Sequence, residues 1–229
     1  MRRMLLALGL SLGVATPVAA EENFLFHMVR AEVDAARIDG EDVIGWEGDA
    51  WIGGDVNKLW FKTEGEIESG ETHDAEIQAL WSRNIATFWD LQTGVRVDLE
   101  PDAVTYLALG VQGLAPYRFE TEATAFVSED GDFSARFGQS LDLRFTQRLI
   151  AEPHVELQAY AQDIEELNIG AGVSDIEAGV QLRYEITRKF APYVDLVWAR
   201  ALGETASLRR ADGEAVETSS VRAGLRFWF

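Results

Sequence analysis

The chain has 229 residues and no cysteine, and its 39 acidic against 20 basic residues give a formal net charge of −19 at pH 7. This composition excludes disulfides and thiolate metal ligands. The acidic balance argues against nucleic acid as a partner, because phosphates are bound by a basic face. The length suits a single domain, including a barrel made only of β-strands.

The amino-terminus has the pattern of an export signal. Arg2 and Arg3 precede an apolar run over residues 4–14, and small residues up to Ala20 precede Glu21. The run is too short to span a bilayer and is followed by a cleavage-type sequence, as in secretory signal peptides. We therefore predict a cleaved signal peptide at residues 1–20 and one mature domain at residues 21–229.

The mature chain alternates apolar and polar residues with a period of two, which predicts β-strands. We expect about twelve strands, at residues 24–33, 43–52, 58–68, 75–81, 88–98, 105–113, 119–128, 133–145, 150–162, 175–185, 192–201 and 219–229. The even-numbered connections are predicted to be tight, and long polar loops are expected among the odd-numbered ones, at residues 34–42, 163–174 and 202–217. This arrangement is typical of outer-membrane barrels with both termini in the periplasm.

The last predicted strand indicates a membrane. Val221, Ala223, Leu225, Phe227 and Phe229 share one face, because side chains alternate along a strand. Such a strand would be an aggregation hazard in water, whereas lipid covers it in an outer-membrane barrel. The terminal Phe also resembles the sorting signal read by the bacterial barrel-assembly machinery.

Alternation alone does not distinguish a barrel in lipid from a soluble sandwich. The export signal, the connection lengths and the terminal Phe together predict an all-β fold: a single antiparallel transmembrane up-and-down β-barrel in the Gram-negative outer membrane, in contact with lipid. The charged faces of its strands would then line the lumen and pair with one another. A weak repeat between residues 85–91 and 190–196 places aromatic side chains next to turns, which predicts an interfacial girdle.

Two pairs of residues are candidate metal ligands. His27 lies beside Met28, and imidazole with thioether suits Cu(I). Adjacent strand residues point to opposite faces, so both bind one ion only from a frayed strand end; the alternative places the Met on the lipid face and the His near the rim. His154 and Glu156 share the lumen face and could join a cation site, or an ordinary hydrogen-bond network.

Evidence for catalysis is weak, and we predict that the protein is not an enzyme. His73 and Asp74 lie in a predicted outer loop, where the pair could orient a general base or simply provide loop polarity. The sequence has no Gly-x-Ser-x-Gly motif, and no Ser stands in an evident relation to His154. A hydrolase that uses the His73–Asp74 pair is one hypothesis, besides the two for a non-catalytic barrel that are given below.

Residues 45–66 resemble the signature hairpin of the copper-resistance protein B family. The resemblance covers essentially all of residues 24–229, with further collinear motifs at residues 75–83, 88–96, 110–117, 126–131, 146–150, 184–186, 190–194 and 224–229. It implies an outer-membrane protein of copper tolerance that is not an enzyme and that acts with periplasmic copper carriers or multicopper oxidases.

Many family members carry a Met- and His-rich segment between signal peptide and barrel. Here cleavage near Ala20 would leave three residues before the first strand, with Met28 as the only mature methionine. Copper binding implied by the resemblance therefore falls on His27, Met28, Glu47, Asp49, His154 and Glu156. We expect a barrel that binds or passes copper ions; the alternative is a general porin-like or structural barrel without dedicated metal chemistry.

Overall fold

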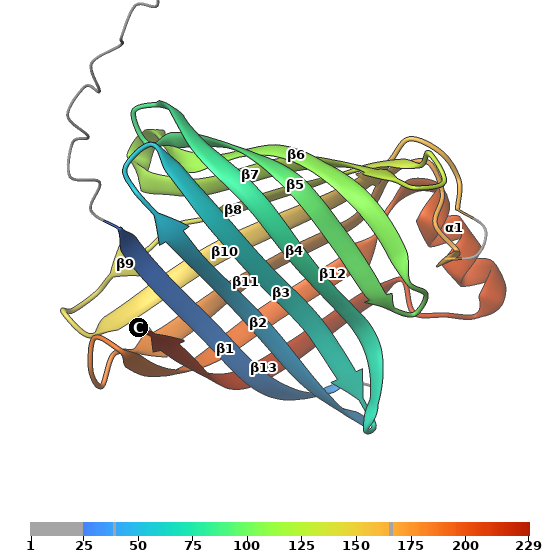
Figure 1. Ribbon diagram of the computed structural model, residues 1–229. Coiled ribbons are helices and arrows are strands. Elements are labelled where there is room, and N and C mark those ends of the chain that lie inside the picture. Colours follow the sequence, from blue (N-terminus) through green and yellow to red (C-terminus); the bar gives the residue numbers. More distant parts are fainter. Residues whose placement is uncertain (1–24, 39, 165–166) are drawn as a thin grey trace, which may run out of the picture.

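The computed structural model describes residues 25–38, 40–164 and 167–229 (Figure 1). The signal peptide predicted at residues 1–20 lies outside the described residues. The strands are β1 (Phe26–Ile38), β2 (Glu41–Gly53), β3 (Asn57–Glu68), β4 (Glu71–Ala86), β5 (Trp89–Glu100), β6 (Val104–Ala115), β7 (Phe119–Ser128), β8 (Phe133–Ser140), β9 (Leu143–Arg144), β10 (Leu149–Tyr160), β11 (Gly172–Tyr184), β12 (Phe190–Ala201) and β13 (Glu217–Trp228). The described helices are a 3₁₀ turn, η1 (Pro116–Arg118), and α1 (Gly203–Asp212).

The strands close into an antiparallel barrel in which sequence neighbours pair throughout. β13 returns to β1, with Arg30 opposite Trp228 and Ala35 opposite Ala223, so the described strands form a closed sheet. β8 and β9 both pair with β10 and act as one interrupted strand, which leaves twelve strands around the circumference. The predicted twelve-stranded up-and-down barrel is therefore confirmed.

The strand predicted at residues 133–145 is broken between β8 and β9. The break lies opposite Pro153 of β10, which has no N–H for the ladder. Leu141 still donates its N–H to the Pro153 carbonyl at 3.1 Å, and Asp142 instead accepts hydrogen bonds from Arg183 at 2.6 and 2.7 Å. The predicted pattern of alternation was right here, and only the hydrogen bonding is interrupted.

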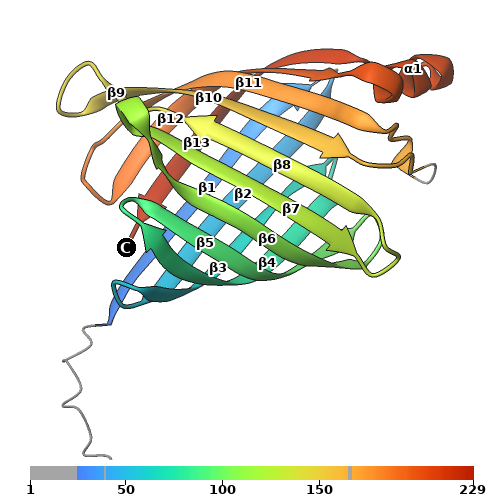
Figure 2. The ribbon, with the colours of Figure 1, turned by 90° about the horizontal axis from the view of Figure 1, so that it is seen from above.

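The long loop predicted at residues 34–42 is wrong, because β1 and β2 pair as far as Ile38 opposite Glu41. Gly40, with φ of 97°, takes the left-handed conformation that such a tight turn requires. The connections at residues 161–171 and 202–216 are long, as predicted, and the second contains α1. Both lie at the end of the barrel opposite the carboxy-terminus (Figures 1 and 2).

These two long connections pack against each other. Thr205 of α1 is fully buried, and its Oγ1 accepts a hydrogen bond from the Gly170 N–H at 3.0 Å. Arg209 of α1 pairs with Asp175 of β11 at 3.2 Å. The helix is therefore fixed to the barrel mouth rather than free in solvent.

The outer face of the barrel is apolar. Large hydrophobic side chains remain exposed along the strands, at Val33, Ile44, Leu59, Phe61, Ile77, Leu107, Leu109, Val180, Leu182, Val194, Leu196, Val221 and Leu225. No helix in the described part of the chain has the length and apolar character to cross a bilayer. At the end that carries the carboxy-terminus, the turns also expose apolar side chains: Val56, Phe88, Tyr117, Phe145 and Ile186. This is the layout expected of an interfacial girdle.

Candidate functional site: an acidic cavity in the lumen

One side of the lumen is filled with packed side chains. Trp60, Leu80, Ala108 and Phe126 form a buried cluster that Met28, Trp51 and Tyr106 extend. The Arg96 guanidinium lies 5.2 Å from the Tyr106 ring centroid and 5.0 Å from that of Phe126, a favourable cation–π distance. This side of the barrel, formed mainly by β3 to β7, leaves little space for a passage.

Ion pairs cross the lumen at the edge of this packed side. Arg136 of β8 binds Glu64 of β3 at 2.6 Å and Glu76 of β4 at 3.0 Å. Lys62 of β3 binds Glu122 of β7 at 2.6 Å. Because these partners belong to strands that are not neighbours in the sheet, their side chains span the interior and separate the packed side from the open one.

The other side of the lumen contains a cavity of about 1030 Å³. Its lining reaches from Leu114 and Glu120, at the end with the carboxy-terminus, to Arg209 and Val216 at the α1 end, so it extends along the barrel. Thirteen carboxylates and five arginines line it: Glu32, Asp34, Glu47, Glu64, Glu66, Asp74, Glu120, Glu122, Glu152, Glu156, Asp175, Glu177 and Asp195, with Arg30, Arg200, Arg209, Arg222 and Arg226.

The arginines of the cavity are already paired. Arg226 contacts Glu32 at 2.5 Å and Glu152 at 2.9 Å, and Arg222 contacts Glu66 at 2.9 Å. Among the described residues no Lys, Arg or His lies within ion-pair distance of four lining carboxylates: Asp34, Asp74, Glu120 and Glu177. The cavity therefore carries an excess of negative charge, which attracts cations.

The His27–Met28 pair does not converge on one point. Both residues lie in the regular ladder between β1 and β2, where His27 is opposite Ile52 and Met28 opposite Trp51. His27 is exposed, whereas Met28 packs on the aromatic cluster inside the lumen. The strand end is thus not frayed, and the two side chains point to opposite faces.

Glu47 and Asp49 face the lumen as predicted, and both bind Arg30. The Arg30 guanidinium donates to Asp49 at 2.6 Å and to Glu47 at 2.9 Å. These two carboxylates are therefore brought together by an arginine in this structure.

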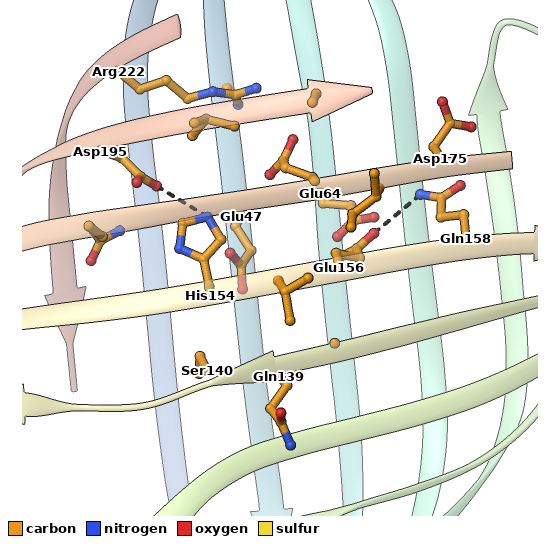
Figure 3. A pocket seen from close by; sticks show the side chains of 18 of the residues that line it. Glu47, Glu64, Gln139, Ser140, His154, Glu156, Gln158, Asp175, Asp195 and Arg222 are labelled. Atoms are coloured by element: carbon orange, nitrogen blue, oxygen red, sulfur yellow. Dashed lines mark hydrogen bonds and ion pairs between the residues drawn. The ribbon is translucent and has the colours of Figure 1, made fainter. Parts of the chain in front are cut away.

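His154 and Glu156 both line the cavity but have different partners (Figure 3). Glu156 accepts a hydrogen bond from Gln158 at 3.2 Å and lies 3.5 Å from Arg136. His154 faces Asp195 of β12, with Nε2 3.8 Å from Oδ2. Sequence reasoning missed this partner, because β12 is not a sheet neighbour of β10; the only signal was the lumen-side Gly179 of β11 between them.

His73 and Asp74 lie in β4 and not in a loop. His73 falls at a bulge in the ladder between β3 and β4, and its ring lies 4.0 Å from Glu68, whereas Asp74 lines the cavity. No hydrogen bond joins their two side chains in the described structure, so the geometry of a catalytic pair is not present. Within the described ranges, no three His, Asp or Glu residues form a cluster that could hold a metal ion.

A closed antiparallel barrel with an apolar outside and a charged inside is the architecture of an outer-membrane β-barrel protein. Solved porins have this fold. The NanC porin aligns with a TM-score of 0.61 and the KdgM porin with 0.52; each is 12% identical and covers 86% of this chain and 98% of its own. The protein is therefore an outer-membrane barrel in contact with lipid.

Sequence relatives identify the family. The family model for Copper resistance protein B precursor (CopB) matches residues 24–229. Copper resistance protein B of Escherichia coli is 42% identical over 199 residues, which cover 86% of this chain and 67% of the relative. A Copper resistance protein B homolog of Pseudomonas syringae pv. tomato is 42% identical over 187 residues, covering 81% and 64%. The chain belongs to the copper resistance protein B family and spans about two thirds of these relatives' length.

Proposed function

We propose that the barrel supports copper resistance by passing copper ions across the outer membrane through its acidic lumen cavity. The observation that carries this proposal is the charge of the cavity, in which thirteen carboxylates face five arginines along the barrel. Membership of the copper resistance protein B family supplies the identity of the cation.

Electrostatics supports the passage of cations in particular. A cleft of one sign inside low-dielectric walls concentrates ions of the opposite sign and speeds their entry. Conduction also requires that each contact be weak enough for the ion to leave. Carboxylates spread along the cavity without a three-residue metal cluster in the described ranges meet that requirement.

The porin fold alone does not identify what passes through this barrel. One solved KdgM porin is described in complex with disordered oligogalacturonate, a chain of sugar acids, and aligns with a TM-score of 0.52. A polyanion would be repelled by the surplus of carboxylates in the present cavity. The charge of the lumen, rather than the fold, therefore favours a metal cation.

We further propose a non-catalytic role in which copper is exchanged with a soluble periplasmic copper carrier or a multicopper oxidase. The separation of His73 from Asp74 removes the geometric support for a hydrolase. A general porin-like barrel is the second candidate, and the likeness of the fold to the NanC and KdgM porins favours it.

A growth assay tests the proposal. Deletion of the gene is expected to increase copper sensitivity, and the intact gene is expected to restore tolerance. The double variant Glu120→Gln/Glu177→Gln removes two unpaired charges of the cavity and should restore tolerance only in part. The matched control Asp55→Asn/Asp130→Asn, which neutralises two exposed turn carboxylates, should restore it fully. Unchanged tolerance in the deletion strain would favour the porin-like barrel.

A further inference from the structure

The cavity contains one place where an imidazole and a carboxylate from different strands face each other. His154 of β10 reaches over β11 toward Asp195 of β12 (Figure 3). The residue beneath the ring is Gly179, opposite His154 in the ladder. A Cβ at this position would lie 2.5 Å from both Cε1 and Nε2 of the ring, so only glycine leaves room for it.

The distance between the two groups is too long for a hydrogen bond and leaves room for a bridging ion. Nε2 of His154 lies 3.8 Å from Oδ2 of Asp195, which is beyond the usual range of a hydrogen bond. Metal–nitrogen and metal–carboxylate bonds are each about 2.0–2.2 Å, so a bent N–metal–O unit separates its two donors by roughly 3–4 Å. An ion therefore fits between the two side chains with little movement.

The other atoms of both side chains favour the same role. His154 Nδ1 lies 3.4 Å from the Glu152 carbonyl oxygen; with the proton on Nδ1, the ring donates there and leaves the Nε2 lone pair toward Asp195. Metal-binding histidines are commonly oriented by such a hydrogen bond. Asp195 is 8% exposed, and its buried Oδ1 has no hydrogen-bond partner among the described residues.

No arginine lies within ion-pair distance of this carboxylate in the described structure. Arg222 is opposite Asp195 in the ladder between β12 and β13, but its guanidinium instead donates to Glu66 at 2.9 Å. Asp34, another acid on the cavity wall, accepts a hydrogen bond from the Tyr193 hydroxyl at 3.0 Å. Among the described residues, His154 is therefore the one basic side chain within ion-pair distance of Asp195, and it faces the Oδ2 atom.

We propose that His154 and Asp195 form a binding station for Cu(II) within the passage, with water in the remaining coordination positions. This inference rests on the proposed function and specifies the oxidation state of its cargo. Imidazole and carboxylate suit Cu(II), which binds such sites more tightly than other divalent first-row ions, whereas Cu(I) prefers thioether sulfur. Met28, the one methionine among the described residues, belongs to the packed side of the lumen.

Two protein ligands make a site of moderate strength, which is what a passage requires. A closed site with three or four protein ligands would retain the ion, whereas a conducting pathway needs contacts that release it. The station lies between the ends of the barrel, because His154 and Asp195 occupy the interior of β10 and β12.

Titration of the detergent-purified barrel with Cu(II), followed by electron paramagnetic resonance, tests the proposal. One saturable ion with a single coordinated nitrogen is expected. Removing even an outer-shell partner of a metal site costs about 10- to 100-fold in affinity, so His154→Ala and Asp195→Asn should each weaken binding at least tenfold. The nitrogen signal should disappear in His154→Ala. His27→Ala and His73→Ala remove the other two histidines of the chain and should leave the titration unchanged.

A second pair of variants keeps both ligands and changes only their geometry. Gly179→Ala displaces the His154 ring and should weaken Cu(II) binding, whereas Gly138→Ala, whose added Cβ meets nothing within 4 Å, should not. Circular dichroism and heat-dependent gel migration confirm that each variant forms a barrel; Asp195→Asn, which preserves shape, remains informative if Gly179→Ala does not fold.

Equal Cu(II) affinity in wild type, His154→Ala and Asp195→Asn would overturn the station, as would loss of binding in His27→Ala or His73→Ala. Such a result leaves the proposed function standing if the intact gene still restores copper tolerance. The proposed function itself would be contradicted by unchanged copper tolerance after deletion of the gene, whatever the titration shows.

Discussion

The two sides of the lumen share the same alternation of inward and outward residues, but they differ in which side chains point inward. On the packed side, aromatic and aliphatic residues such as Trp60, Leu80 and Phe126 fill the interior, and ion pairs close its edge. On the open side, glycines lie under long side chains, as Gly179 lies under His154, and several carboxylates have no basic partner. The packed side thus stabilises the barrel, and the open side leaves a charged cavity through which ions can pass.

The largest loss of stability is expected when Arg136, whose ion pairs separate the two sides, is substituted. Its substitution by Ala would leave Glu76, which is 2% exposed, with one arginine fewer and Glu64 with none in the described contacts. Breaking a buried ion pair in this way destabilises proteins by about 3–5 kcal/mol. We expect a loss of that order in the free energy of unfolding, measured by urea denaturation of the barrel in lipid vesicles.

Arg200→Ala is the matched control for this prediction. Arg200 pairs with Glu217 at 3.8 Å at the outer mouth, where both side chains are about half exposed. Exposed pairs of this kind contribute about 0–1 kcal/mol. Equal effects of the two substitutions would contradict the view that the crossing ion pairs hold the interior together.

The next effect in size is expected at Leu80, which is 1% exposed in the centre of the packed cluster. Leu80→Ala leaves a cavity among aromatic rings and should lower the free energy of unfolding by about 2–4 kcal/mol. Single-channel conductance should change little, because the new space is separated from the passage. A large rise in conductance would show that the packed side also admits ions.

The smallest effect on stability is expected at Arg209, which pairs with Asp175 at the mouth of the cavity. Both side chains are about one third exposed, so Arg209→Ala should change the free energy of unfolding by about 0–1 kcal/mol. The substitution removes a positive charge from the entrance and should raise the preference of the channel for cations over anions. Reversal-potential measurements in a planar bilayer would detect it, and an unchanged preference would argue against entry at this mouth.

Much of the fold could be predicted from the sequence, because a two-residue period fixes both the strands and the face on which each side chain lies. The closing strand at residues 219–229 and the inward direction of His154 and Glu156 followed from that rule. The turn between β1 and β2 was missed, since polar residues near a tight turn resemble those of a loop. The break between β8 and β9 was missed, because the residue pattern does not show that Pro153 of the partner strand lies opposite it.

The contents of the lumen were harder to predict. Alternation places Glu47, Asp49 and Asp195 inside, but it does not show how far a side chain reaches across its neighbours. The pairing of Arg30 with Asp49 depends on the register that places them opposite each other in the ladder between β1 and β2. The approach of His154 to Asp195 depends on Gly179, which leaves room for the ring to reach across β11. These are properties of the closed barrel and not of any single strand.

The burial of Thr205 against Gly170 joins the two long outer connections into one body. A Cβ at Gly170 would collide with Glu204 and with the backbone of Thr205, so a larger residue does not fit at this contact. Surface loops of barrels are usually free to vary one at a time. Here sequence drift in either one would have to be matched in the other, and an epitope tag inserted in one would disturb both.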